Sequence, residues 1–194
     1  MPEQKEPYRV LVVSSSAKYS KLLGECLPGP QYFPIDCVAT AGEAKRRLIS
    51  THYSIIIINS PLEDDFGSRL ALDISAQYTA GILLLVKAEL FEQTAYGVED
   101  SGVVTLPKPT SRQMVYSAVK MLTAVQAKIQ KIQRETVGLK SRMEEIRLVN
   151  RAKWVLINRL KMTEPEAHRY IEKQAMDRCV KKSQVAQSIL RTYE

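Results

Sequence analysis

The sequence predicts an α/β domain with a parallel sheet, then a long coiled-coil helix, then a small three-helix bundle. Short apolar runs alternate with amphipathic stretches over the first 110 residues, which is typical of parallel strands covered by helices on both faces. From Ser111 the chain has no proline and one glycine until Pro165, which favours a continuous helix. Capping signals then divide the remaining residues. We therefore expect domains at residues 1–110, 111–149 and 150–194.

The first domain is expected to contain five strand–helix units. The apolar runs predict strands at residues 9–13, 35–39, 54–59, 81–86 and 103–106. Helices are expected at residues 17–27, 42–50 and 68–77, with a further helical stretch after the fourth strand. Five such units at this length predict the flavodoxin-like doubly wound fold, whose functional groups gather at the carboxyl ends of the strands.

Two features of this domain resemble the receiver domain of response regulators. The Leu106-Pro107-Lys108-Pro109 element resembles the Lys-Pro that follows strand five, and Gly67 lies eight residues past Asn59 as in many receivers. The resemblance implies a phosphotransfer site. Such a site needs two acids after strand one to hold Mg²⁺ and an aspartate after strand three to accept the phosphoryl group.

This sequence lacks that chemical set. Asn59 stands at the phosphoacceptor position, and an amide cannot accept a phosphoryl group. The degenerate pocket comprises Ser14 and Ser15 at the acid-pair positions, Val86 and Thr105 at the two switch positions, and the remaining Lys108. We expect Lys108 to fill the pocket and bond nearby carbonyls. The domain is predicted to be a pseudo-receiver that is not controlled by phosphorylation and that offers a surface to a regulatory protein partner.

The long helix carries an apolar seam with alternating steps of three and four residues, the coiled-coil period. Its members are Leu122, Val125, Ile129, Ile132, Thr136, Leu139, Met143 and Ile146. This seam predicts a parallel homodimer; the alternative is a helix packed on its own receiver. Asn150 continues the spacing, where a polar residue can set the register of a coiled coil, or it belongs to the module that follows.

Residues 145–190 predict three short helices with their own apolar stripes. Thr163 and Glu166 form a capping box for the second helix, with Pro165 in its first turn, and Ser183 is expected to cap the third. Three such stripes bury one another only as a bundle. The stripes are Val155 and Leu160; Ala167, Tyr170, Ile171, Ala175 and Val180; and Val185, Ala186, Ile189 and Leu190.

This segment resembles the ANTAR domain, the RNA-binding module of response regulators that act by transcription antitermination. The resemblance spans about 45 residues and rests on Ala152-Lys153, Thr163 to Ala167, Ala175-Met176, and Val185-Ala186 with Ile189. It implies that the target is paired hairpins in a leader transcript, one form of which blocks a terminator. A dimer would present two bundles and so could hold two hairpins.

The charge is divided unevenly along the chain. Residues 1–110 hold 10 Lys and Arg against 13 Asp and Glu, a net −3, whereas residues 111–194 hold 18 against 8, a net +10. The asymmetry indicates a polyanionic partner or, alternatively, a solvated helical face. The candidate RNA-binding residues are Asn150, Arg151, Lys153, Trp154, Arg169, Lys173, Arg178, Lys181 and Lys182. Trp154 either stacks on a base or belongs to the core.

Several classes of function are disfavoured. Three widely spaced cysteines and two histidines give no metal-ligand pattern, and no nucleophile–base pair for an enzyme is visible. Glu63, Asp64 and Asp65 are expected to form a solvated loop and not a metal site. No cofactor and no small-molecule substrate is evident. The first residues have no apolar stretch of a signal peptide, and no apolar run could span a bilayer, so we expect a soluble, cytoplasmic protein.

Two other functions stay open at this point. One is a DNA-binding response regulator, although the stretch after Met162 lacks the short glycine-containing turn of a helix-turn-helix. The other is a coiled-coil protein-interaction adaptor. Comparing the binding of hairpin RNA with that of duplex DNA at equal salt, and measuring the salt dependence, would distinguish these two functions from RNA-binding antitermination.

Overall fold

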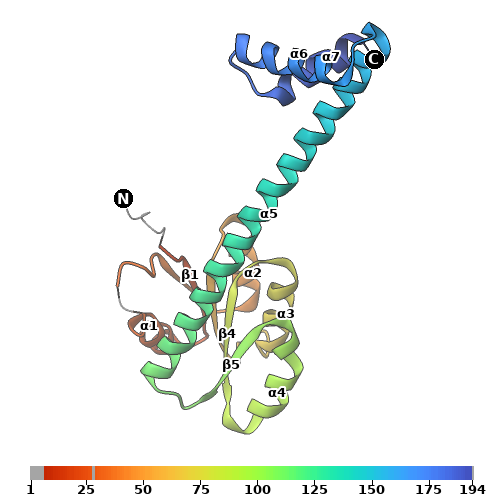
Figure 1. The fold of residues 1–194 in the computed structure, drawn as a ribbon. Coiled ribbons are helices and arrows are strands. Elements are labelled where there is room, and N and C mark those ends of the chain that lie inside the picture. The colour runs from red at the N-terminus through yellow and green to blue at the C-terminus, as the bar shows by residue number, and fades with distance from the viewer. Residues whose placement is uncertain (1–6, 28, 194) are drawn as a thin grey trace. The chain divides into compact units, whose positions relative to one another are not determined.

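The computed structural model describes residues 7–27 and 29–193 (Figure 1). The amino-terminal stretch on which the prediction of no signal peptide depends therefore lies mostly outside the described residues. The chain divides into two compact units, residues 1–130 and residues 131–194.

The first unit is a five-stranded sheet with helices on both faces. Its strands are β1 (Val10–Val13), β2 (Ile35–Val38), β3 (Ile55–Asn59), β4 (Gly81–Lys87) and β5 (Val103–Lys108). All neighbours are parallel and the order is β2-β1-β3-β4-β5, which confirms the predicted flavodoxin-like fold. Because β1 lies beside β3, the residues that follow these two strands meet at one edge of the sheet.

Each face of the sheet has its own core. One face is covered by α2 (Ala41–Ser50), α3 (Ser68–Gln77) and α4 (Phe91–Val98), which bury side chains such as Leu48, Leu70 and Val98 against Ile56 and Leu84. The other face is covered by α1 (Ala17–Glu25) and the start of α5 (Arg112–Leu160) (Figure 1). Strand residues alternate between the two cores, so the continuous apolar runs reflect burial on both sides.

The first turns of α5 complete this domain. Val115, Ala118, Val119 and Leu122 are buried against the sheet. A β-carbon at Gly81 would lie only 3.0 Å from the β-carbon of Leu122, so helix and strand are in close contact. Leu122, the first residue of the predicted dimer seam, is therefore a core residue of the receiver fold, 6% exposed, because its side chain faces the sheet. The part of the seam on the helix surface begins at Val125.

The second unit contains a three-helix bundle, as predicted. The end of α5 packs with α6 (Glu164–Asp177) and α7 (Lys182–Tyr193). Its buried core comprises Ala152, Leu156, Ala167, Ile171, Ala175, Val185, Ala186, Ile189 and Leu190. Leu160, Tyr170 and Val180, which the sequence places in the buried stripes, are exposed. Leu160 is the last residue of α5, Tyr170 lies on the edge of the α6 stripe, and Val180 lies in the connection between α6 and α7.

The helix ends of the bundle follow from local chemistry. The Glu166 carboxylate accepts hydrogen bonds from the amide and the hydroxyl of Thr163, both at 2.8 Å, which fixes the start of α6. The prediction that Ser183 caps α7 is wrong. The helix begins at Lys182, and the Lys181 carbonyl already accepts from the Gln184 amide at 3.0 Å, so Ser183 lies inside the first turn.

Candidate functional site

The carboxyl ends of β1, β3 and β5 bring together three of the predicted pocket residues. The Asn59 side chain is 5% exposed, and its Nδ2 donates to Ser14 Oγ at 2.9 Å. Lys108 Nζ donates to Asn59 Oδ1 at 2.8 Å and also to the Ser60 carbonyl. The side chain of Lys108 thus bonds nearby oxygens, as the sequence predicts. The pocket thus holds neutral polar groups and one cation at the positions where phosphotransfer would need carboxylates.

The other predicted pocket residues make no ion-binding set. Ser15 is exposed and its hydroxyl donates to the Pro61 carbonyl at 3.4 Å. Val86 is buried and Thr105 is half-buried. Burial lowers the pKa of Lys108, and the charge of Lys87 contributes in the same direction. The ammonium lies 5.9 Å from the centre of the Tyr19 ring, a cation–π contact.

The acidic loop after β3 caps helices. Asp64 accepts from the amides of Ala41 at 2.8 Å and Gly42 at 2.9 Å, at the start of α2. Asp65 accepts from the Gly67 amide at 2.6 Å. Asp64 and Glu63 are exposed, as predicted, but Asp64 and Asp65 are held by backbone amides. Across residues 7–27 and 29–193 no group of three or more His, Cys, Asp or Glu side chains is placed to hold a metal ion.

The predicted seam lies on the surface of α5 beyond Leu122. Val125, Ile132, Leu139, Met143 and Ile146 are all more than half exposed, and Ile129 is partly exposed. Large apolar side chains along one line of an exposed helix are typical of a coiled-coil surface.

The predicted RNA-binding cations are spread over the bundle, and Lys153 and Lys182 are in ion pairs. Lys153 Nζ lies 2.7 Å from Glu164 Oε1, and Lys182 Nζ lies 2.5 Å from Glu172 Oε1. Each lysine donates a hydrogen bond that lowers the pKa of its partner carboxyl. Arg151, Arg169, Lys173, Arg178 and Lys181 are exposed.

A groove of about 400 Å³ joins part of this set. Asn150, Lys153 and Lys182 line it together with Arg142 and His168, and the other lining residues are Glu145, Ile146 and Val149. Sequence reasoning missed Arg142 and His168. Arg142 lies two turns before Asn150 on the same helical face, a spacing that could have identified it. His168 lines the groove only because α6 packs against α5.

Trp154 lies on the solvent side of α5, 66% exposed, between the buried Ala152 and Leu156. The alternative that it belongs to the core is therefore wrong. An exposed indole is suited to stacking on an unpaired base.

Residues 138–190 match the ANTAR domain. The preceding sheet has the receiver fold. It superimposes on the signal receiver domain of an HD domain-containing protein from Pseudomonas fluorescens Pf-5 with a TM-score of 0.60 and 20% identity, over 68% of this chain and 97% of that one. It also superimposes on a receiver domain protein from Methanospirillum hungatei JF-1 with a TM-score of 0.57 and 17% identity, over 63% of this chain and 98% of that one. A receiver fold followed by an ANTAR domain is the architecture of an ANTAR response regulator.

Similarity to a full-length relative extends over nearly the whole chain. The transcriptional regulatory protein PdtaR of Mycobacterium tuberculosis, in strains CDC 1551 and H37Rv, is 27% identical over 189 residues, covering 96% of this chain and 91% of that protein. The ANTAR match begins within α5, before the bundle itself. In the part of the chain that the structure describes, none of the helices is apolar over enough length to cross a membrane.

Proposed function

We propose that this ANTAR response regulator binds hairpins in leader transcripts and promotes transcription antitermination. The observation that carries the proposal is the ANTAR domain itself, whose surface combines an exposed Trp154 with the cations around the Asn150 groove. Single-stranded loop bases are recognised by stacking planes, and RNA phosphates are held by Lys and Arg. The protein would act as a regulator in the cytoplasm, where transcripts are made, and not as an enzyme.

RNA binding in this proposal replaces intramolecular ion pairs. Lys153 and Lys182 each have a carboxylate partner, so an incoming phosphate must displace Glu164 or Glu172. Both carboxylates lie on the surface and return to water when released. The exchange at Lys182 therefore costs little, because exposed ion pairs contribute only about 0–1 kcal/mol.

We further propose that the chain acts as a homodimer through the seam from Val125 to Ile146. A single helix leaves these apolar side chains in water, and a second copy would bury them in coiled-coil packing. Two copies present two ANTAR domains, which suits a target with two hairpins. Asn150 lines the groove and also continues the spacing of the seam. It therefore lies where the proposed dimer surface and the proposed RNA surface meet.

The receiver is proposed to work without phosphorylation. Asn59 is already bonded at both ends of its amide, and the pocket has no carboxylate pair to hold Mg²⁺. Control would then come from a regulatory protein that contacts the receiver, or from the amount of protein made.

The test is to recover the transcripts that full-length protein retains from total RNA of the source organism and to sequence them. We expect enrichment of leader segments with hairpins before a terminator. A retained hairpin is then compared with duplex DNA of equal length at equal salt. Tighter binding of the hairpin, with a steep salt dependence, supports the proposal. Preference for the duplex would favour a DNA-binding regulator, and no retained nucleic acid would favour an adaptor.

A further inference from the structure

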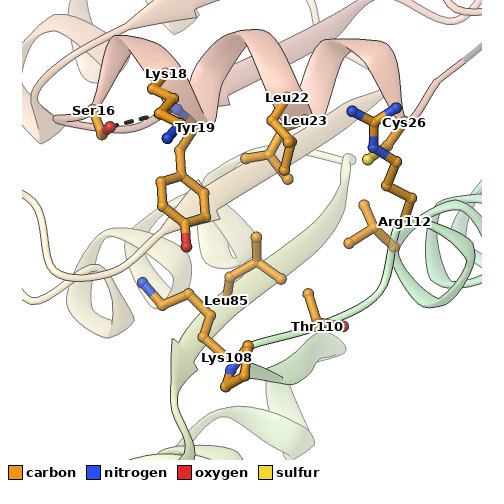
Figure 2. Close-up of a pocket in the computed structure, with 12 residues that line it drawn as sticks. Ser16, Lys18, Tyr19, Leu22, Leu23, Cys26, Leu85, Lys108, Thr110 and Arg112 are labelled. Carbon is orange, nitrogen blue, oxygen red and sulfur yellow. Dashed lines mark hydrogen bonds between the residues drawn. The ribbon is translucent and has the colours of Figure 1, made fainter.

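A cavity of about 290 Å³ opens between α1 and the segment that joins β5 to α5 (Figure 2). Leu23, Leu85 and Val115 line it with apolar groups, and Figure 2 shows the Tyr19 ring extending from α1 toward Lys108. The volume is at the lower end of the range for small-molecule sites in proteins. The cavity thus has the size and the apolar surface to hold the body of a small organic molecule.

Positive charge surrounds this cavity. Lys18, Lys108 and Arg112 all line it. Arg112 donates to Glu25 at 3.1 Å, but neither lysine has a carboxylate partner among the described residues. The two acceptors of Lys108 are an amide oxygen and a backbone carbonyl, which leave its charge uncompensated. Burial lowers the pKa of Lys108, and an anion placed beside it would offset that cost.

The cavity wall also contains an unsatisfied hydroxyl. Within residues 7–27 and 29–193, Thr110 Oγ1 is the one buried side-chain N or O atom without a hydrogen-bond partner. Thr110 lines the same cavity as the cations. Buried polar groups in native proteins almost always have a partner, and this hydroxyl, which is closed off from water, has none.

We propose that this cavity binds a small organic carboxylate with an aromatic or branched apolar body. The apolar body lies between Leu23, Leu85 and Val115, and the carboxylate lies at the end where Lys108 and Tyr19 meet. Arg112 and Val115 belong to α5, so the ligand contacts the helix that also carries the dimer seam. The inference is independent of RNA binding, because its test measures the ligand alone.

The experiment titrates full-length protein with three probes that share one ring system: 1-naphthylacetate, 2-(1-naphthyl)ethanol and 1-naphthylethylamine. Calorimetry measures affinity, and amide chemical shifts locate the site. We expect saturable binding of the carboxylate in the sub-millimolar range, weaker binding of the alcohol and none of the amine. Absence of saturable carboxylate binding, or shifts that map away from α1 and the start of α5, would overturn the proposal.

Two variants and a control make the assignment specific. Lys18→Gln should weaken binding of the carboxylate roughly three- to fivefold, because it removes one exposed charge, and should leave binding of the alcohol unchanged. Lys21 lies on the same helix but does not line the cavity. Lys21→Gln changes the net charge by the same amount and should change the affinity of neither the carboxylate nor the alcohol. Leu22→Trp, at the exposed rim, should weaken both probes by filling space. Equal losses in Lys18→Gln and Lys21→Gln, or unchanged binding in Leu22→Trp, would contradict the site.

Discussion

Asn59 has a structural role at the position where a receiver has its phosphoacceptor. Its amide has a donor end and an acceptor end, and Ser14 and Lys108 satisfy both. A carboxylate would offer only acceptors, and Ser14 would then have to donate instead. The network thus holds β1, β3 and β5 together with hydrogen bonds that use no metal ion.

Lys108→Ala tests this structural role. The substitution leaves Asn59 Oδ1 and the Ser60 carbonyl without their donor, and a buried polar group without a partner costs about 1–3 kcal/mol. We expect urea unfolding to show a loss of this size. Lys87→Ala, an exposed lysine at the end of the neighbouring strand, should change the free energy of unfolding by less than about 0.5 kcal/mol. Equal losses would show that the network contributes nothing special.

Silence toward phosphodonors is the second prediction at this scale. Incubation with acetyl phosphate and Mg²⁺ should give no acid-labile adduct by intact mass, in the natural protein or in Asn59→Asp. Ser14 and Ser15 supply no negative charge to hold the metal, so restoring the acceptor alone is insufficient. A receiver with its full acid set, treated in parallel, confirms that the donor is active. An adduct that alters RNA affinity would refute the proposed mode of control.

At the scale of elements, the start of α2 is held partly by a group far away in sequence. The amides of Gly42 and Ala41, at the start of α2, lower the pKa of Asp64, which lies in the loop after β3. Because Asp64 belongs to a different strand–helix unit, this cap also fixes the loop beside the Asn59 pocket.

The cap of α2 should be pH-dependent. With a folded pKa below its unfolded value, the Asp64 carboxylate stabilises the protein fully above about pH 4 and loses that effect as pH falls through the lowered pKa. Asp64→Ala should therefore lower the urea midpoint at pH 7, and its difference from the natural protein should shrink below pH 4. Glu63→Gln, an exposed neighbour, serves as the control. A difference that persists unchanged in acid would contradict the cap.

The helix α5 has two roles along its length. Its first turns are buried on the receiver sheet up to Leu122, and from Val125 its apolar residues are exposed. The same spacing of apolar residues therefore contributes to the receiver core up to Leu122 and forms an exposed seam from Val125 onward.

Ile132→Glu combined with Leu139→Glu should give a monomer, because each substitution places an unpaired charge inside the proposed dimer seam. Sedimentation at several protein concentrations measures the mass. Val137→Glu is the matched control: Val137 is apolar and exposed, but lies one residue past the seam position Thr136 on the outer side of the helix. A dimer that survives the double substitution, or dissociates equally with Val137→Glu, would exclude this seam.

For the whole molecule, the governing feature is the separation of charge. The receiver part is slightly acidic and the remainder is strongly basic, so a polyanion is attracted to the ANTAR domain and repelled by the receiver. The proposed RNA surface thus has the electrostatics that hairpin phosphates require.

Lys181→Gln with Lys182→Gln should weaken binding of a retained hairpin about tenfold or more. Each lost phosphate contact should also reduce the slope of log affinity against log salt by about 0.7–0.9. Filter binding between low and moderate salt measures both. Lys21→Gln with Lys87→Gln removes two exposed lysines from the receiver and should leave the slope unchanged. Equal effects of the two pairs would mean that only the net charge matters.

The sequence by itself determined the elements, the flavodoxin-like fold and the bundle. Strand and helix periods are local, and five apolar runs between amphipathic stretches admit few arrangements other than a parallel sheet. It also determined which chemistry is missing, since Asn59, Ser14 and Ser15 lack carboxylates in any fold.

Only the tertiary structure decided what each apolar or charged face contacts. Periodicity shows that Leu122 and Val125 share a helix stripe, but the edge of the sheet decides which is buried. Likewise, the exposure of Trp154, the cap formed by Asp64 and the pairing of Lys153 with Glu164 depend on groups brought together from distant positions. A stripe encodes a preference for burial, whereas its partner is set by how the elements pack.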